Sequence, residues 1–365
     1  MRRAGLALDL LRANFSREHR RKAPRPFKLT FSVTDECSCR CAVCHLWKAP
    51  RPGPSLSSIE RLFAANPYLA WINLTGGEVL ERPDFVEIVR AAHRSTRVCL
   101  LDFPTAGQRP EEIEERIREV LKLGLPQLFV TVSLDGPPEV HDRLRGTPGA
   151  FSRAAETIRR LKPLASSRFR VCAGLTLSSR NDTDPERLIT ELLEAAPFLR
   201  RSDLHFNLAH HSPHAYRNAS RAVPDRNAAA AFLASERVRR RLSLHPLAWL
   251  EASYWKLAER YLATERSPIP CTALSASAFV DPDLRLFPCI SWDHPLVDLR
   301  TVGFSLEAAL EQARVQEARA RARTGRCPGC WTPCEAFPNM LASLGKTAAA
   351  CLRDERPPAP VESRP

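Results

Sequence analysis

Three cysteines in one short segment have the spacing needed to hold an iron–sulfur cluster. Cys37, Cys41 and Cys44 follow the pattern C-x3-C-x2-C directly after a strand-like run. Three thiolates on one loop can bind three irons of a [4Fe–4S] cube, which leaves the fourth iron open to another ligand. A structural zinc site usually takes four protein ligands. The spacing therefore favours an open, catalytic cluster over a zinc knuckle or a chance grouping. Cys39 lies inside the triad and could compete as a ligand, but the register favours a bystander thiol.

A Gly-Gly-Glu sequence follows the next strand-like run. Gly76 and Gly77 permit a close approach of the backbone to a ligand, because neither carries a side chain that would collide. Glu78 adds a carboxylate that can accept charge-assisted hydrogen bonds. Taken alone, the three residues also fit an ordinary turn between a strand and a helix.

Together these two motifs resemble those of the radical S-adenosylmethionine (SAM) enzymes, over residues 26–215. The resemblance implies a [4Fe–4S] cluster on Cys37, Cys41 and Cys44, whose open iron is chelated by the amino and carboxylate groups of SAM. In that family one electron from the cluster cleaves SAM to methionine and a 5′-deoxyadenosyl radical, which takes a hydrogen atom from the substrate. Glu78 would accept a hydrogen bond from the SAM ammonium.

The same resemblance assigns further residues to SAM. Related enzymes contact its ribose or methionine part at positions that match Ser133 and Asp135, and Arg145 would meet its carboxylate. The alternative is a turn followed by a surface arginine. Val43 replaces a frequent aromatic residue and Val79 a frequent proline. Backbone atoms do much of the adenine recognition in the family, so neither change argues strongly against activity.

A second group of cysteines lies near the C-terminal end, in the patterns C-x17-C and C-x2-C-x3-C. It resembles the SPASM/twitch extension of radical SAM enzymes, and its small number of cysteines favours the twitch form with one auxiliary [4Fe–4S] cluster. The expected ligands are Cys271, Cys289, Cys327 and Cys330, with Cys334 as a fifth candidate that could displace one of them. A structural zinc site would need the same four thiolates. Residues 279–289 predict a β-hairpin around a Pro-Asp turn.

Histidines follow the last strand-like run of the barrel region. His210 and His211 leave that run, and His214 follows shortly after. Imidazole groups titrate near neutral pH, so His211 and His214 are candidates for substrate contact or proton transfer. The alternative is that they are packed loop residues.

Strands and helices alternate regularly before residue 210, and they must position these groups. The expected strands are 27–33, 71–74, 98–103, 128–134, 169–177 and 204–208, with helices at 57–66, 83–94, 110–123, 150–161 and 185–198. Such alternation predicts a parallel sheet. The polar motifs all follow the C-terminal ends of strands, where barrel-like α/β folds gather reactive groups. We therefore expect an α/β fold, a partial (β/α)6 TIM-like barrel with a small C-terminal α+β cluster-binding domain.

The expected organisation has five parts. They are a basic N-terminal helix and linker (1–25), the radical SAM barrel (26–215), a helical connection (216–267), the SPASM/twitch-like auxiliary domain (268–350), and a disordered tail (351–365). The auxiliary domain is expected to contain a helix from Ser305 to Arg321.

The composition of the chain indicates its cellular compartment and the kinds of partner it could bind. Twelve cysteines in a 365-residue chain without a recognisable secretion signal indicate metal binding in a reducing cytoplasm rather than disulfides. No apolar run is long enough for a transmembrane segment. The net charge of +13 is spread along the chain without a nucleic-acid motif, so we expect no nucleic-acid partner. A basic surface suits an acidic low-potential electron donor of the ferredoxin or flavodoxin type.

The resemblance predicts hydrogen abstraction from a peptide or protein, or from a small metabolite in cofactor or natural-product biosynthesis. The 33 residues ahead of Thr34 are too few for a separate peptide-binding domain. This weakens the case for a peptide substrate without excluding it, since a separate peptide-binding chain could supply the domain. Two alternatives stay open: a nucleic-acid-modifying radical SAM enzyme, suggested by the charge, and a non-catalytic zinc-stabilised binding module.

Overall fold

The computed structural model describes residues 25–181, 184–218, 226–240 and 246–352. The predicted N-terminal helix and the predicted C-terminal tail fall outside these ranges, apart from residues 25, 351 and 352.

Six strands form a parallel sheet in chain order. They are β1 (Lys28–Thr34), β2 (Trp71–Gly76), β3 (Leu100–Thr105), β4 (Leu128–Ser133), β5 (Phe169–Leu177) and β6 (Leu204–Leu208). Each strand pairs in parallel with the next one along the chain. The six predicted strands are confirmed, with small shifts at their ends.

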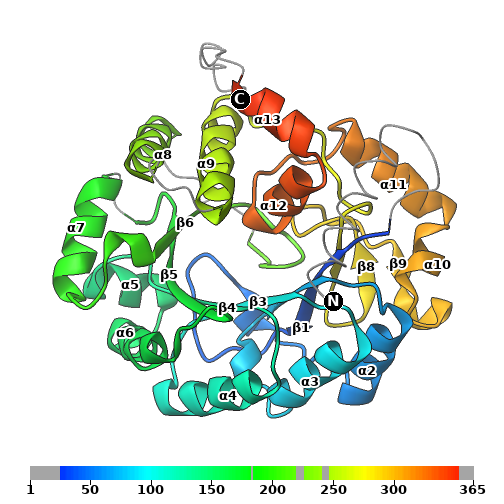
Figure 1. The fold of residues 1–365 in the computed structure, drawn as a ribbon, viewed down its shortest axis with the longest axis horizontal. Helices are drawn as coiled ribbons and strands as arrows, with labels where there is room; N and C mark the ends of the chain where they lie inside the picture. Colours follow the sequence, from blue (N-terminus) through cyan, green and yellow to red (C-terminus); the bar gives the residue numbers. More distant parts are fainter. Residues whose placement is uncertain (1–24, 182–183, 219–225, 241–245, 353–365) are drawn as a thin grey trace.

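Helices follow the strands and cover one side of this sheet (Figure 1). They are α2 (Leu56–Ala65), α3 (Phe85–Ser95), α4 (Pro110–Lys122), α5 (Pro138–Arg145), α6 (Ala150–Leu161) and α7 (Pro185–Ala195). The start of α7 follows from its sequence, because Asp184 accepts hydrogen bonds from the N–H groups of Glu186 and Arg187 and a proline occupies the first turn. The helix α5 was not predicted, since its residues read as a turn. It ends at Gly146, which adopts the left-handed conformation at φ 59°.

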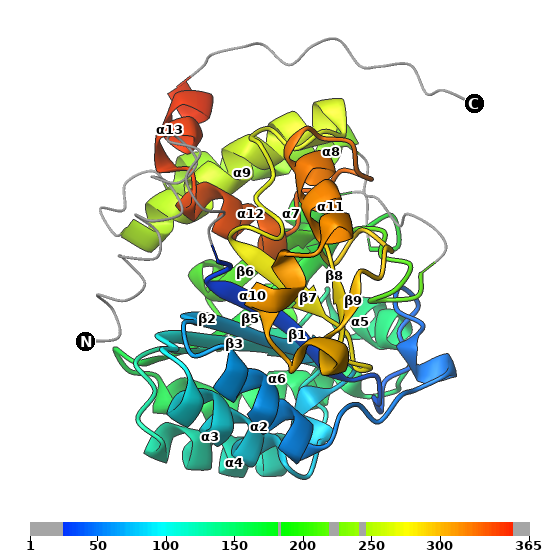
Figure 2. The ribbon, with the colours of Figure 1, turned by 90° about the vertical axis from the view of Figure 1, so that its right-hand side faces the viewer.

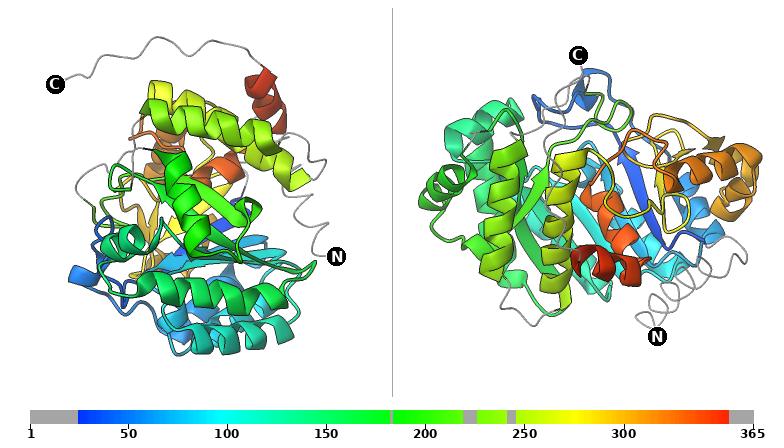
Figure 3. Two further views of the ribbon diagram at one scale, coloured as in Figure 1. Left: turned by 90° about the vertical axis from the view of Figure 1, so that its left-hand side faces the viewer. Right: turned by 90° about the horizontal axis from the view of Figure 1, so that it is seen from above.

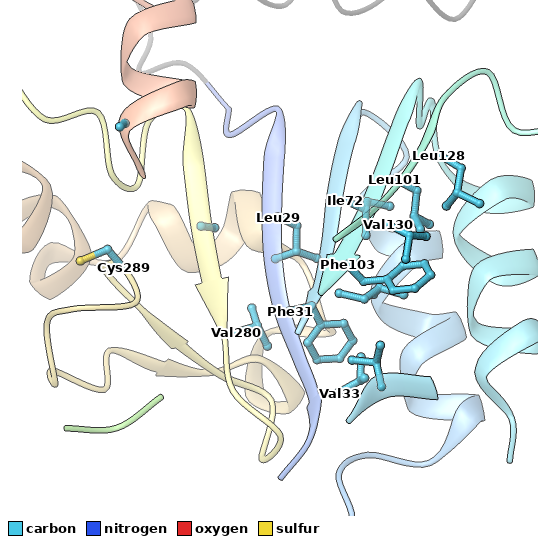
Figure 4. Close-up of a cluster of buried hydrophobic side chains, with 14 of the residues drawn as sticks. Leu29, Phe31, Val33, Ile72, Leu101, Phe103, Leu128, Val130, Val280 and Cys289 are labelled. Carbon is cyan, nitrogen blue, oxygen red and sulfur yellow. The ribbon is translucent and has the colours of Figure 1, made fainter. Parts of the chain in front are cut away.

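The two faces of the sheet differ in polarity. Side chains alternate between the faces of a strand, and the face under the helices carries apolar residues such as Phe31, Phe103 and Val130 (Figure 4). The opposite, inner face of β1 carries Lys28 and Thr30, which are buried although they are polar. The inner face is therefore the one that can hold polar chemistry.

Three more strands extend the same sheet beyond β1 (Figure 2). They are β7 (Ser277–Val280), β8 (Arg285–Phe287) and β9 (Val297–Asp298). The strand β7 runs parallel to β1, and β8 returns antiparallel to β7. The predicted hairpin is confirmed, and the C-terminal segment is joined to the barrel by direct strand pairing.

The remaining helices lie mainly after the barrel. They are α8 (Arg226–Arg240), α9 (Pro246–Thr264), α10 (Leu306–Leu310), α11 (Ala313–Arg323), α12 (Pro333–Leu341) and α13 (Leu344–Leu352). The helices α8 and α9 pack side by side (Figure 3), and α9 and α12 lie on the side of the sheet opposite α2–α4 (Figure 1). The predicted helix from Ser305 to Arg321 is wrong as one element, because Gln312 is extended at ψ 138° and separates α10 from α11. Across the described ranges, no helix combines the length and apolar character needed to cross a membrane.

Candidate active site

The cysteine loop directly follows β1 and gathers four thiols. Cys39 and Cys41 are buried, and Cys37 and Cys44 pack half-buried against them together with Ala106. Burial raises the pKa of Cys44 to about 12. Such a thiol stays protonated near neutral pH unless a metal compensates the charge of its thiolate, as metal coordination does.

Four closely packed thiols offer the kind of donor set that an iron–sulfur cluster uses. Among the described residues, no three His, Cys, Asp or Glu side chains are arranged to hold one metal ion. Zinc needs its ligands within about 2.0–2.3 Å of one point, whereas each thiolate of a [4Fe–4S] cube binds a different iron. Cluster binding by Cys37, Cys41 and Cys44 stays a prediction, and the packing also brings Cys39 into the group.

The Gly-Gly-Glu segment is fixed against this loop by backbone hydrogen bonds. The N–H of Gly77 donates to Thr34 O and that of Glu78 to Glu36 O, both at 2.7 Å. A Cβ at Gly76 would lie 2.0 Å from Thr34 O, and one at Gly77 would lie 2.0 Å from Glu36 O. The close approach that the glycines permit is thus to the protein's own backbone. It places Glu78 beside the cysteine loop.

Glu78 is buried, and its carboxylate already accepts hydrogen bonds from the protein backbone. Its Oε2 accepts a hydrogen bond from the N–H of Ala106 at 2.7 Å, and its Oε1 accepts one from Leu80 at 3.3 Å. Burial raises its pKa from 4.5 to about 7. A carboxylate with spare acceptor capacity in such a site can gain strongly from a cationic partner.

The raised pKa of Glu78 predicts a pH-dependent stability of the metal-free chain. Between pH 4.5 and pH 7 the folded state holds this proton more tightly than the unfolded state, so the free energy of unfolding falls as the pH rises through that window. The expected fall is about 3 kcal/mol. Urea unfolding at pH 5 and pH 8 should show a smaller fall in the free energy of unfolding for Glu78→Gln than for the wild type.

The exposed Glu87 is the control, and Glu87→Gln should show the same fall in the free energy of unfolding between the two pH values as the wild type. Equal pH dependence in Glu78→Gln and the wild type would contradict the assignment.

A buried ion pair lies on the other side of the cysteine loop. Arg145 Nη2 lies 2.5 Å from Asp135 Oδ2, and Arg145 Nη1 lies 3.9 Å from the Sγ atom of Cys41. Asp135 Oδ1 also accepts a hydrogen bond from the N–H of Thr176 at 3.1 Å. The backbone at the end of α5 holds the loop too, since Arg40 N donates to Arg145 O at 2.9 Å. Arg145 is therefore a largely buried cation beside the thiols, with its side chain 16% exposed.

Ser133 lies at the end of β4, opposite Gly174 of β5. The structure brings it to the same end of the sheet as Asp135, on the adjoining turn. The contacts of Ser133, Asp135 and Arg145 with SAM stay predictions.

The histidines after β6 are packed against aromatic rings. The ring of His214 stacks on Phe287 with centroids 4.4 Å apart, and the ring of His210 lies 5.2 Å from that of Tyr216. Burial lowers the pKa of His210 and of His214 to about 4. His211 is half-buried. Substrate contact by His211 and His214 stays a prediction.

Sequence reasoning missed a strap, residues 209–218, that runs between the two cysteine groups. The hydroxyl of Ser212 donates to Ile290 O, one residue after a cysteine of the C-terminal group. Ser212 N donates to Asn218 Oδ1 at 2.8 Å, and Asn218 Nδ2 donates to Val43 O at 3.2 Å, one residue before a cysteine of the first loop. Neither polar residue belongs to a motif, so only the fold could reveal the link.

An ion cluster at the base of the cysteine loop was also missed. The carboxylate of Asp35 lies 2.5 Å from Arg51 Nε and 2.9 Å from Arg217 Nη2. Arg51 Nη1 also lies 3.0 Å from Asp281 and 2.6 Å from Asp283, both in the turn between β7 and β8. Burial raises the pKa of Asp35 in spite of the two arginines. The cluster holds the cysteine loop against the C-terminal hairpin.

The C-terminal cysteines come together from three segments. A hydrogen bond with Cys330 and burial raise the pKa of Cys289. Burial and the charges of Glu335, Cys330 and Cys327 raise the pKa of Cys271. Cys334 belongs to a separate apolar cluster with Phe279, Phe287 and Ile290, and burial raises its pKa to about 11. The charge of Cys330 also raises the pKa of Cys334. The ligand set Cys271, Cys289, Cys327 and Cys330, with Cys334 as a fifth candidate, stays a prediction.

The match to a known family covers both motifs around the first loop. The sequence of residues 31–195 matches the Radical SAM superfamily. Residues 31–195 form a radical SAM domain. The resemblance predicted from the cysteine loop and from Gly76, Gly77 and Glu78 is therefore confirmed.

Curated relatives share part of this region. The sporulation killing factor maturation protein SkfB of Bacillus subtilis (strain 168) is 27% identical over 182 residues, which cover 48% of this chain and 42% of SkfB. The antilisterial bacteriocin subtilosin biosynthesis protein AlbA of the same organism is 32% identical over 146 residues, covering 38% of this chain and 31% of AlbA. The matches thus span less than half of the length of these relatives.

Solved structures show the same fold over most of the chain. The structure of native anSMEcpe with bound AdoMet aligns with a TM-score of 0.58 at 12% sequence identity, and covers 89% of this chain and 99% of that one. This likeness, with the six parallel strands, confirms the predicted α/β partial barrel.

Proposed function

We propose that this protein is a radical SAM enzyme in which Cys37, Cys41 and Cys44 hold a [4Fe–4S] cluster. The observation that carries the proposal is the backbone pairing of the cysteine loop with Gly77 and Glu78, which sets the triad and the acidic residue side by side. When bound and reduced, the cluster supplies the electron that cleaves SAM to methionine and a 5′-deoxyadenosyl radical. That radical would abstract a hydrogen atom from the substrate.

The residues around the loop would bind and orient SAM. Glu78 has acceptor capacity left for the ammonium group, because its oxygens accept two backbone hydrogen bonds and one from the side chain of Thr105, out of about four lone-pair sites. Arg145 would meet the SAM carboxylate from its place beside Cys41, where Asp135 holds it. Ser133 and Asp135 would meet the ribose or methionine part.

We propose a second, auxiliary [4Fe–4S] cluster in a twitch-type site. Cys271, Cys289, Cys327 and Cys330 would be its ligands, which the grouping of their thiols supports. Cys334 remains a fifth candidate, but its packing in another cluster makes it the weaker one. The strap and the ion cluster at Asp35 would hold the two sites at a defined separation.

The proposed substrate is a peptide or protein. The names of the two curated relatives, a maturation protein of a killing factor and a biosynthesis protein of a bacteriocin, support this class. A small metabolite is the competing substrate class. A separate peptide-binding chain and an acidic ferredoxin or flavodoxin are the proposed partners. A reducing cytoplasm is the proposed setting, since all twelve cysteines, which lie in the described ranges, are free thiols.

The proposal predicts reductive SAM cleavage by the purified chain. After anaerobic reconstitution with iron and sulfide, it should hold about eight irons per chain, four for each of two cubes. With dithionite and SAM it should release 5′-deoxyadenosine and methionine, both measured by liquid chromatography with mass spectrometry. Zinc without sulfide, and no 5′-deoxyadenosine, would contradict the proposal and support the binding-module alternative. Salt-dependent RNA binding would instead support the nucleic-acid alternative.

A further inference from the structure

A buried histidine outside the proposed SAM contacts holds the backbone of Asp135. The N–H of Asp135 donates to Nδ1 of His141 at 3.0 Å, and 0% of His141 is exposed. Because a backbone N–H can only donate, Nδ1 is the acceptor, and the proton of the neutral ring lies on Nε2. Burial also lowers the pKa of His141 to about 4, so the ring is neutral near neutral pH and Nδ1 keeps its lone pair.

His141 and Arg145 hold Asp135 from one helix. They are four residues apart in α5, so they lie on the same face of the helix, one turn apart. His141 accepts from the backbone of Asp135, and Arg145 Nη2 lies 2.5 Å from its Oδ2 atom. The helix is therefore attached to Asp135 at two points, and the backbone contact fixes the place from which the carboxylate reaches the guanidinium.

The other polar atoms of Asp135 have partners that cannot replace the histidine. Its Oδ1 accepts from the N–H of Thr176 at 3.1 Å, and its carbonyl oxygen accepts from Nδ2 of Asn181 at 2.9 Å. Both partners are donors, whereas the N–H of Asp135 needs an acceptor. Without Nδ1, this buried N–H would lose its hydrogen bond, and the turn would have to shift to satisfy it.

Arg145 has donors left for an anion. A guanidinium carries five N–H donors. Within the described ranges, Nη2 contacts Asp135 and Nη1 lies 3.9 Å from the Sγ atom of Cys41, whereas the buried Nε has no acceptor. A carboxylate of a ligand can accept from these unused donors, provided that Asp135 keeps the guanidinium in place.

We propose that His141 is a positioning residue that keeps Arg145 in place as the anchor of the SAM carboxylate. This inference rests on the proposed function, because it takes Arg145 to meet that carboxylate. His141 acts through Asp135, whose own carboxylate orients the guanidinium. Removing the acceptor at Nδ1 should therefore weaken the binding of ligands that carry the carboxylate, and it should leave the binding of the nucleoside part unchanged.

Three substitutions separate the acceptor from the size of the side chain. His141→Asn can place its amide oxygen where Nδ1 lies, so it keeps the acceptor. His141→Leu has nearly the shape of asparagine without an acceptor, and His141→Gln is an amide whose oxygen lies one bond further out. The control is His93→Leu, because His93 lies in the last turn of α3, ahead of β3 and thus at the opposite end of the sheet from the cysteine loop.

The test is the binding of two stable ligands to the reconstituted full chain, measured by isothermal titration calorimetry. S-adenosylhomocysteine keeps the amino and carboxylate groups of SAM, and methylthioadenosine lacks both. His141→Leu and His141→Gln should raise the Kd of S-adenosylhomocysteine about tenfold, the lower end of what a lost outer-shell partner costs a metal site. His141→Asn and His93→Leu should stay within about twofold of the wild type, and methylthioadenosine should bind to every variant within the same limit.

The outcomes separate an anchor from a general effect on the fold. An unchanged Kd of S-adenosylhomocysteine in both His141→Leu and His141→Gln overturns the inference. An equal loss for both ligands, a loss in His141→Asn as large as in His141→Leu, or a loss of bound iron in both His141→Leu and His141→Gln also overturns it, since each points to structural damage. A variant that loses iron alone leaves the decision to the other one.

The wild type separates this inference from the proposed function. If it binds S-adenosylhomocysteine no more tightly than methylthioadenosine, the chain has no carboxylate anchor and the role of His141 is overturned. In that case the release of 5′-deoxyadenosine from SAM still reports independently on the radical SAM assignment.

Discussion

Alanine at Cys37, Cys41 or Cys44 should abolish 5′-deoxyadenosine release, whereas Cys39→Ala should retain it. Loss of outer-shell partners alone typically costs a metal site 10–100-fold in affinity or activity, and a lost thiolate ligand should cost more than about 100-fold. Cys39 is the matched control. It is buried in the same group of thiols and its substitution removes the same sulfur atom, but it lies outside the C-x3-C-x2-C register.

Metal analysis separates the two sites in this experiment. Each triad variant should keep about four irons on the C-terminal cysteines, and Cys39→Ala should keep about eight. A variant with full activity and full iron at any triad position would contradict the assignment. Activity lost in Cys39→Ala and kept in one triad variant would instead make Cys39 a ligand, a result that the mutual packing of the four thiols makes worth measuring.

The strands and the main helices could be predicted because their signals are local. Apolar runs predict the strands, and capping residues such as Asp184 and Pro185 predict where a helix begins. The helix α5 has only 8 residues. It is too short to show a helical pattern of apolar residues, so its sequence reads as a turn. The break at Gln312 lies in a stretch rich in helix formers, so local propensity could not reveal it.

The candidate site likewise has residues that the sequence predicts and contacts that only the fold reveals. The cysteines and Gly76, Gly77 and Glu78 carry their chemistry in their types and spacing, so the sequence predicts them. The contacts of Lys28 with Cys334, and of Asn218 with Val43, join residues far apart in the chain. Only the pairing of β1 with β7 and the course of the strap bring them together. The role of the glycines also differs in detail from the prediction, because the nearest atoms to their missing side chains belong to Thr34 and Glu36.

The pair of Asp135 and Arg145 shows how far the site depends on a single buried contact. Their side chains are 8% and 16% exposed, and the charged atoms lie 2.5 Å apart. Arg145→Met should lower the free energy of unfolding of the metal-free chain by about 3–5 kcal/mol, since it leaves a buried carboxylate unpaired. Urea unfolding under anaerobic conditions measures this change. Arg118→Met, which breaks an exposed pair with Glu114, should cost no more than about 0.5 kcal/mol.

The double variant Asp135→Asn/Arg145→Met decides whether the pair or its surroundings carry the stability. With neither charge left, most of the loss seen in Arg145→Met should be recovered, because the large cost of breaking a buried pair comes from the partner left behind. Thr176 N would still have an acceptor, since the introduced amide oxygen can replace the Oδ1 atom of Asp135. A double variant as unstable as Arg145→Met would contradict this account. If stability returns but SAM binding does not, the pair contributes to the SAM site beyond its role in folding.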